Sequence, residues 1–555
     1  MLLGAVFERE VLVAPRSRGL FIARAVYAGT LVGLVATCWL VVTGSQPIAT
    51  VGDAARFGGT LLRILGPLQL VLAMLAAALT SVVAVGVEKD RRTLELLLLS
   101  RLDDAQLVLG KLAGSLLRVG LLLVAAIPVF ALAATFGGVT AMQLARMFAV
   151  TAAAAIAAAA VANAVAFWRD TTFQSLAITA FLLAAWLMFG EALSVAGRGD
   201  LAAAMSPARS LFAALSPAGG GMLPSFLLAC GGIAAIASGW AIARLRHWNS
   251  AESSRPAASI ASAATRPPRR VWSNPVLWRE ICTRAHGRAL ALVRIAWLVL
   301  FAAAVAGVVA QARAPRPDRM AVAVAIVPAI LASLLALAAR AVTSVTGEKD
   351  RGTFDLLLVS DLEPGEFVWG KLLGVLAASA EMVALPLVLA VALVPLGLAS
   401  VEHGAELAAG VALLTFFVVV LGIYAGLSHT SSRRAIAVAL GVVAFLAIGV
   451  ATAMRIMVAF GGSFELQLAP FLAVIVGGAV GLYAALSARN PSPAVGWTAA
   501  LLPALTFVAI TGFLQGSSLQ VFLVVLAAYG FGTAALLVPA VAAFDLLTGR
   551  TTTGE

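Results

Sequence analysis

Long apolar stretches recur along the whole chain and limit it to one class of fold. The 555 residues are 62% apolar and only 12% charged, which is too little charge to cover the surface of soluble domains. A membrane-spanning helix needs roughly 20 apolar residues, and windows of that length give about fourteen candidates. Bilayers exclude open sheet edges, and the ten-residue alternation of an outer-membrane barrel is missing. The sequence therefore predicts an all-α polytopic integral membrane protein.

The candidate spans divide into two sets around one long polar segment rich in Pro, Ser and Arg. They lie near 21–43, 61–86, 112–136, 143–167, 171–194 and 223–246, and then near 290–311, 320–346, 373–399, 404–428, 435–459, 469–487, 497–513 and 520–545. We expect a six-helix unit at 1–246, a cytosolic linker at 247–273 and a second six-helix unit at 274–487. Two additional helices and a short tail would occupy 488–555.

The net charge of +12 is explained by topology. If the chain starts inside and its helices alternate, most Lys and Arg fall in cytosolic segments, which is the bias that orients membrane proteins. This predicts a bacterial-type inner membrane location with both termini cytosolic, and no nucleic-acid partner. Cys38, Cys230 and Cys282 imply no disulfide framework, and the four His show no metal-ligand spacing.

A charged loop is repeated in the two halves. Glu88–Lys111 aligns without a gap to Glu348–Lys371, and thirteen of the 24 positions are identical. The apolar stretches that follow agree at far fewer positions, so composition alone does not produce the match. A weaker echo, Arg-Glu, precedes the first span of each unit at 9–10 and 279–280. Six spans return the chain to the same side, which predicts parallel repeats related by an axis along the membrane normal.

Each copy of the loop is predicted to form a short helix followed by the next span. Thr93–Leu99 and Thr353–Val359 are apolar with one acid each, which favours helices lying at the membrane interface. Two capping boxes would open the next helices, formed by Ser100 with Asp103 and by Ser360 with Glu363. Lys111 and Lys371 stand where the chain enters lipid, and we expect their ammonium groups to snorkel to the headgroups.

The repeated pattern Glu-Lys-Asp-Arg-x-Thr-[Leu/Phe]-[Glu/Asp]-Leu-Leu-Leu-x-Ser, with Gly-Lys at its end, resembles the ABC-2 type permease family. Two features depart from the usual family pattern: Arg92 replaces a Gly that is kept as Gly352, and neither Ser100 nor Ser360 is followed by Pro. The resemblance implies that each six-span unit is a transmembrane half of an ABC exporter, whose short loop helix docks on a separate ATPase. The residues that it assigns to docking are Glu88, Lys89, Asp90, Arg91, Thr93, Glu95, Lys111, Glu348, Lys349, Asp350, Arg351, Thr353, Asp355 and Lys371.

The partner implied by this resemblance is an ABC-type ATPase subunit that acts as a dimer, because two docking helices match two equivalent clefts. ATP and Mg²⁺ would then be bound by the partner, and this chain would bind no cofactor and catalyse no reaction. The bilayer is its other partner, and pairing with further transporter subunits is left open. The sequence does not name the transported substrate.

One apparent nucleotide site does not meet the requirements of a phosphate loop. Residues 365–371 match the spacing G-x4-G-K, but Leu372 follows where Mg²⁺ needs Ser or Thr, and no strand precedes. Ala105 replaces the first Gly in the other copy. We therefore expect no ATP binding at this segment.

Three charges are predicted to lie inside spans, at depths of roughly 10–15 Å. Arg118, Arg340 and Glu381 are functional-site candidates because an unpaired charge in a bilayer costs a few kcal/mol. Arg340 and Glu381 flank the same loop at similar depth, and Thr80 and Leu121 replace them in the first copy. This arrangement predicts an Arg340–Glu381 ion pair that makes the halves unequal.

Two other classes of function compete with the ATP-driven transporter. A secondary transporter can also contain parallel repeats, but it needs buried acids along a pathway, and only Glu381 is clearly placed. A membrane enzyme would need His, Asp or Cys groups converging at one membrane face, and the sequence shows none. A neighbouring reading frame for a soluble chain with ATPase motifs would decide for the ATP-driven transporter.

Overall fold

The computed structural model describes residues 4–13, 18–45, 50–90, 93–169, 172–195, 199–216, 221–249, 272–282, 289–350, 352–451, 453–454, 464–490 and 492–549. Within these ranges the chain is almost entirely helical and has no β-strand, which confirms the all-α prediction. The chain divides into two compact units, one of residues 1–266 with 460–466 and one of 267–459 with 467–555. Most of the expected linker, 250–271, lies outside the described residues.

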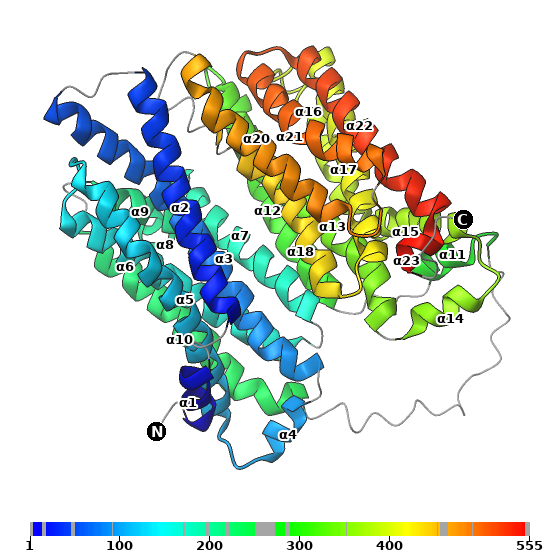
Figure 1. Ribbon diagram of the computed structural model, residues 1–555, viewed down its shortest axis with the longest axis horizontal. Helices are drawn as coiled ribbons and strands as arrows, with labels where there is room; N and C mark the ends of the chain where they lie inside the picture. The colour runs from blue at the N-terminus through cyan, green and yellow to red at the C-terminus, as the bar shows by residue number, and fades with distance from the viewer. Residues whose placement is uncertain are drawn as a thin grey trace. The chain divides into compact units, whose positions relative to one another are not determined.

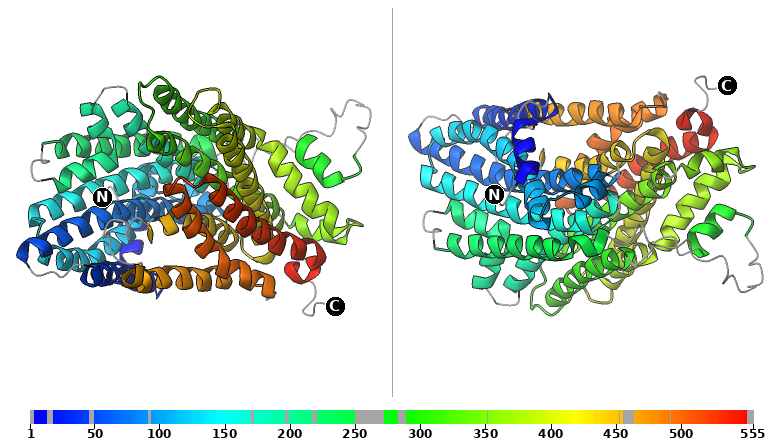
Figure 2. Two further views of the ribbon diagram at one scale, coloured as in Figure 1. Left: turned by 90° about the horizontal axis from the view of Figure 1, so that it is seen from above. Right: turned by 90° about the horizontal axis from the view of Figure 1, so that it is seen from below.

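The first unit is a bundle built around one Ala-rich helix, α6. Its long helices, blue to green, run side by side in both views of Figure 2. Helix α6 packs against α3, α5, α7, α9 and α10, and 67% of its most apolar window is buried. The helices are α1 (Gly4–Val13), α2 (Arg18–Ser45), α3 (Val51–Asp90), α4 (Thr93–Leu99), α5 (Asp104–Thr135), α6 (Ala141–Trp168), α7 (Thr172–Val195), α8 (Gly199–Met205), α9 (Pro207–Leu215) and α10 (Leu223–Asn249).

The second unit is a bundle in which α17 takes the central place. Helix α17 packs against α13, α15, α16, α18 and α22, and its last twelve residues, 417–428, are all buried. The elements are α11 (Pro275–Cys282), α12 (Ala289–Ala312), α13 (Arg319–Asp350), α14 (Thr353–Val359), α15 (Pro364–Ala378), α16 (Ala380–Ala392), α17 (Val401–Ser428), α18 (Ser432–Ala444), the π-helical η3 (Phe445–Gly449), α20 (Phe464–Leu486), α21 (Pro493–Leu514), α22 (Ser518–Ala542) and α23 (Phe544–Thr548).

Many of these helices are suited to cross a membrane. Among the described residues, eight are long and apolar enough by length and composition, and α15 with α16 makes a ninth if the bent pair is one span. Five further apolar helices are shorter: Leu20–Ala36, Ile178–Leu187, Trp297–Ala312, Arg434–Ala447 and Phe471–Leu486. Each predicted span overlaps one of these helices. The chain is a multi-pass membrane protein, and the total of about fourteen crossings stays a prediction.

Small side chains allow the central helices to approach their neighbours closely. A Cβ added at Gly422 of α17 would lie 2.5 Å from the Cβ of Ala341 on α13, and one at Gly426 would lie 3.0 Å from Val345. At the matching positions of α6, Ala162 and Ala166 are buried. Within lipid, close packing of small residues is a main source of helix association. This close packing positions α3 and α13, whose ends lead into the repeated loops.

One span differs between the units. Helix α5 runs unbroken through 32 residues, whereas the corresponding segment of the second unit divides at Ser379 into α15 and α16, which meet at a bend of 65°. Pro386 lies within α16, but α5 carries Pro128 without a comparable division. The break therefore has a cause other than proline alone, and it lies near the charged residues described below.

Candidate docking loops and intramembrane charges

Two short helices form the exposed part of the repeated loops. Helices α4 and α14 lie at the ends of the long helices of their own units (Figure 1) and have the bounds that the sequence predicts. Each buries one side chain, Leu94 or Phe354, against its unit. The opposite side exposes one acid and two apolar residues, which we call the docking faces: Glu95, Leu96 and Leu99 on α4, and Asp355, Leu356 and Val359 on α14.

Side chains of the loop close it at both ends. The hydroxyl of Thr93 donates to the backbone oxygen of Glu88 at 3.2 Å and also to its carboxylate, while Thr353 donates to the backbone oxygen of Glu348 at 3.3 Å. Ser100 donates to the carbonyl of the residue three positions earlier, and so does Ser360. Both serines therefore satisfy carbonyls at the ends of α4 and α14.

The predicted capping boxes are wrong. Asp103 and Glu363 occupy the N-cap positions of α5 and α15, and neither makes a side-chain cap hydrogen bond. The serines that would complete the boxes are directed to the preceding helix. Each hydroxyl lies close to a carbonyl in the last turn of α4 or α14, and this local acceptor outcompetes the next helix.

The lysine of the Glu-Lys-Asp-Arg motif fastens each loop to the fourth span of its unit. The ammonium of Lys89 donates to the carbonyls of Phe167 and Arg169 at 2.7 and 2.8 Å, at the end of α6. Lys349 donates to carbonyls at the end of α17, those of Gly426, Leu427 and His429. A helix C-terminus leaves carbonyls unpaired and carries partial negative charge, so a cation is stabilised there.

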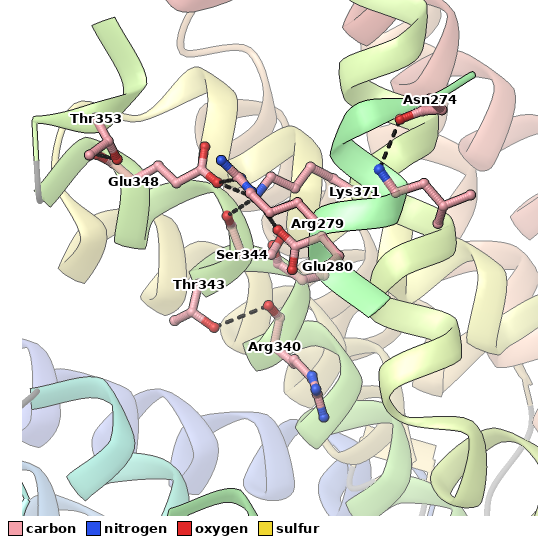
Figure 3. Close-up of polar contacts among 11 residues, drawn as sticks. Asn274, Arg279, Glu280, Arg340, Thr343, Ser344, Glu348, Thr353 and Lys371 are labelled. Atoms are coloured by element: carbon pink, nitrogen blue, oxygen red, sulfur yellow. Dashed lines mark hydrogen bonds and ion pairs between the residues drawn. The ribbon is translucent and has the colours of Figure 1, made fainter. Parts of the chain in front are cut away.

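A charge cluster of four residues lies beneath α14, which we call the unit 2 cluster: Arg279, Glu280, Glu348 and Lys371. The side chain of Lys371 is 1% exposed, and its ammonium lies 2.5 Å from Glu348 and 2.6 Å from Glu280. It also donates to the Ser344 carbonyl at 2.8 Å (Figure 3). Arg279 forms an ion pair with Glu348 and is 3.6 Å from Glu280. Two cations and two carboxylates thus join α11, α13 and α15.

The first unit has a related charge cluster, in which the lysine and the returning helix's glutamate pair with different partners. We call it the unit 1 cluster: Arg9, Glu10, Glu88, Lys111 and Arg118. Lys111 is 2.8 Å from Glu88, which also interacts electrostatically with Arg9. Glu10 lies 2.6 Å from Arg118 instead of pairing with the lysine. The cluster joins α1, α3 and α5, in the same way as its counterpart joins α11, α13 and α15. The Arg-Glu echo of the sequence therefore marks a helix that returns to the repeated loop.

Two glycines allow these returning helices to approach. A Cβ at Gly114 of α5 would lie 2.8 Å from the Cγ of Glu10, and one at Gly374 of α15 would lie 2.7 Å from the Cβ of Glu280. Such distances are shorter than real Cβ contacts, so any larger residue would displace the acid. The two positions correspond when the alignment of the loops is continued by three residues. Each acidic side chain is thus packed over a glycine and directed to a cation.

The expectation that Lys111 and Lys371 snorkel to headgroups is wrong. Both residues are buried, at 5% and 1% exposure, and both ammonium groups are used in ion pairs. Sequence position showed where the chain enters lipid, but it did not show that α1 and α11 fold back over that point. Because these returning helices cover the lysines, each ammonium group is buried and paired with a carboxylate instead of reaching the headgroups.

The expected Arg340–Glu381 ion pair is also wrong. Glu381 lies 2.5 Å from Arg294 of α12, which additionally donates to the Ala378 carbonyl at 2.6 Å. Arg340 is buried, and none of its three guanidinium nitrogens has a hydrogen-bond partner in the part of the chain that the structure describes. Arg118, the third predicted intramembrane charge, pairs with Glu10. Equal depth on two helices did not fix the direction in which either side chain extends.

Some of the remaining predicted docking residues lie within the described ranges of the chain and others lie outside them. Asp350 ends α13 and accepts a hydrogen bond at 2.6 Å from Ser432, and Asp90 ends α3. Arg91 and Arg351 lie outside the described residues. Sequence reasoning did not include Glu10, Glu280 and Arg294 among the candidate site residues. The Arg-Glu echo was the available signal for the first two, and a lone arginine within an apolar stretch was the signal for Arg294.

Comparison with known protein families gives a match within the second unit. Residues 300–475, from within α12 to within α20, match the model of the ABC-2 family transporter protein. The chain contains an ABC-2 type permease domain. This confirms the family that the repeated loops resemble, and it makes the chain a component of membrane transport. Comparison with curated proteins gives no significant match.

Proposed function

We propose that this ABC-2 permease is the membrane-spanning component of an ATP-driven exporter, with a separate ATPase dimer docking on α4 and α14. The observation that carries the proposal is the matching pair of docking faces. Leu96 and Leu99 are 67% and 84% exposed, and Leu356 and Val359 are 73% and 85% exposed at the corresponding positions. Exposed apolar side chains grouped with a polar rim are typical of protein interaction sites.

The surroundings of the docking faces support a mechanical role. Each face stands on a helix of seven residues, which is too short to be stable by itself. Its position is fixed by the threonine, by the lysine anchor to the end of α6 or α17, and by the charge cluster of its unit. A movement imposed on α4 or α14 would therefore pass to the long spans that these contacts join, rather than being lost in a flexible loop.

The duplication supports a symmetric partner. Both units bury an apolar residue at the same position, Leu94 or Phe354, and expose an acid and two apolar residues at corresponding positions, so one chain would fill two equivalent clefts of an ATPase dimer. ATP and Mg²⁺ belong to that partner in this proposal. The loop ends of the spans would face the cytosol of a bacterial-type inner membrane, with both termini on the same side.

The proposal can be tested by placing a charge in each docking face. We expect Leu96→Asp and Leu356→Asp each to weaken co-purification of the ATPase subunit, and the double variant to abolish it. Burying an unpaired carboxylate against an apolar partner surface costs several kcal/mol. Two similarly exposed apolar residues at the start of α6 and α17, on the opposite ends of those spans, serve as controls in Met142→Asp and Val401→Asp.

Two results would contradict the proposal. One is normal ATPase binding and transport in the Leu96→Asp/Leu356→Asp variant, with membrane insertion equal to that of the controls. The other is substrate transport by the purified permease that depends on an ion gradient and needs no ATP. The second result would favour the secondary transporter.

A further inference from the structure

Helix α13 contains a buried cation that lacks an acceptor. Arg340 is 9% exposed, and Nε, Nη1 and Nη2 have no hydrogen-bond partner among the described residues. Its guanidinium points away from the unit 2 cluster (Figure 3), so Glu348 and Glu280 do not serve it as hydrogen-bond acceptors. Leaving a buried donor unsatisfied costs free energy, and the cost is larger for a charged group. A buried guanidinium with five free N–H groups indicates a place for an anion.

The division between α15 and α16 lies at the same depth as this cation. Glu348 and Lys371 are bonded across α13 and α15. Counting eight residues along each helix from that pair reaches Arg340 on one and Ser379 on the other, which is ~12 Å at ~1.5 Å per residue. Ser379 is fully buried, and its hydroxyl has no partner in the described chain. Helix α13 packs against both α15 and α16.

The charges around the break leave one positive charge uncompensated. Arg294 and Glu381 pair at 2.5 Å, and both interact electrostatically with Arg340. Glu280 also lies within electrostatic range, but Lys371 compensates it at 2.6 Å. Two arginines and one carboxylate therefore balance to a single positive charge. One anionic group would neutralise it.

The first unit lacks this combination. Helix α5 is continuous where the second unit breaks. Thr80, Val119 and Leu121 stand at the positions of Arg340, Ser379 and Glu381. The threonine uses its hydroxyl within its own helix, donating to the Ala76 carbonyl at 2.8 Å. The unpaired cation and the break thus occur together in the second unit, and both are missing at the matching positions of the first.

We propose that the break is a binding site for one phosphate or carboxylate group, with Arg340 and Ser379 as the donors; we call it the helix-break site. Arg294 and Glu381 flank it and set its net charge. The first turn of α16, which begins beside Ser379 without a side-chain cap, adds the partial positive charge of a helix N-terminus. Broken transmembrane helices bind anionic groups in this manner. The anion comes either from a soluble compound or from the headgroup of a lipid.

The experiment uses the full chain in a neutral detergent, without an ATPase, so its outcome is independent of the docking proposal. Thermal unfolding is followed at constant ionic strength with inorganic phosphate, acetate, dihexanoyl phosphatidylglycerol or uncharged dihexanoylglycerol. We expect a saturable rise in Tm with at least one anionic probe and none with the uncharged lipid. A response to phosphate or acetate identifies a soluble source, and a response to the anionic lipid alone identifies a lipid.

Four variants test which residues bind the probe. Arg340→Gln should weaken binding by about tenfold or more, because it removes hydrogen bonds to a charged group. Arg340→Lys keeps the charge, so its affinity for the probe should lie between those of Arg340→Gln and the unsubstituted chain. Glu381→Gln should tighten binding by removing a repelling carboxylate. Thr80→Val at the matching position of the first unit is the control and should bind as the unsubstituted chain does.

The proposal is overturned if no anionic probe gives a saturable shift, or if Arg340→Gln binds as tightly as the control. If Arg340→Gln does not fold, Ser379→Ala and Arg340→Lys carry the test, and unchanged affinity in both overturns the proposal. A loss of affinity in Glu381→Gln would also contradict it, because the carboxylate would then act in binding the probe.

Discussion

Removing the ammonium of Lys371 is the perturbation whose effect the structure defines most closely. Lys371→Met keeps the length of the side chain and deletes the charge that lies between Glu280 and Glu348. Their carboxylate side chains are only 10% and 11% exposed, so water cannot fully replace the lost partner. Arg279 continues to pair with Glu348, which leaves Glu280 with the weaker contact of 3.6 Å.

The expected loss is about 3–5 kcal/mol of unfolding free energy, the range for breaking a buried pair by removing one partner. At ~2–4 °C per kcal/mol for a unit of this size, Tm should fall by at least about 6 °C. Lys111→Met is the matched variant in the first unit. It leaves one carboxylate, Glu88, which keeps its hydrogen bond from Thr93 and the nearby charge of Arg9, so a smaller loss is expected.

Thermal unfolding of the purified chain in neutral detergent measures both variants. Adding Glu280→Gln to Lys371→Met should recover part of the stability, because the stranded carboxylate is then neutral. A Tm change below about 2 °C for Lys371→Met, roughly 1 kcal/mol or less, would refute the reasoning. So would a double variant less stable than Lys371→Met alone, since the lysine would then have a role other than charge compensation.

Three further predictions concern the loops and their supports. Lys349→Met should speed hydrogen exchange in the last turn of α17, because that turn loses three bonds to its carbonyls; unchanged exchange would contradict the anchor. Gly374→Ala should destabilise the chain by about 1–3 kcal/mol through displacement of α11, whereas Gly410→Ala, with nothing within 4 Å of the added Cβ, should be neutral or stabilising in the same unfolding assay. Arg101 and Asp361 are exposed at corresponding positions and carry opposite charges. If the two sites are equivalent, Arg101→Asp and Asp361→Arg should change the amount of ATPase that co-purifies at low salt in opposite directions. Changes in the same direction would show that the two sites are not equivalent.

The amino-acid pattern was sufficient for the helical class, the bounds of α4 and α14, and the repetition of the loop. Apolar windows of the length of a bilayer and a charged segment that repeats across them are properties of the chain itself. They need no knowledge of how helices are arranged. The hydrogen bonds by which Thr93 and Thr353 close the loops were not predicted, although they involve neighbours only five positions away.

The parts that could not be predicted depend on contacts between distant segments. Lys371 looks like a residue at a membrane surface until Glu280 is brought to it by α11. The depth of Arg340 and Glu381 could be counted along their helices, but the rotation of those helices could not, and α12 supplies Arg294 as the nearer partner. The break at Ser379 likewise has no sequence signature that the continuous α5 lacks, apart from the charged residues around it.

The most direct test of the central claim is photo-crosslinking from the two most exposed apolar positions of the docking faces. A photoreactive amino acid is placed at Leu99 or at Val359 in the full chain, with Val401, which is also largely exposed, as the control at the other end of a span. The account predicts crosslinks from both docking positions to a soluble ATPase subunit and none from Val401. Crosslinks from both docking positions to lipid alone, in membranes that contain the assembled transporter, would contradict it.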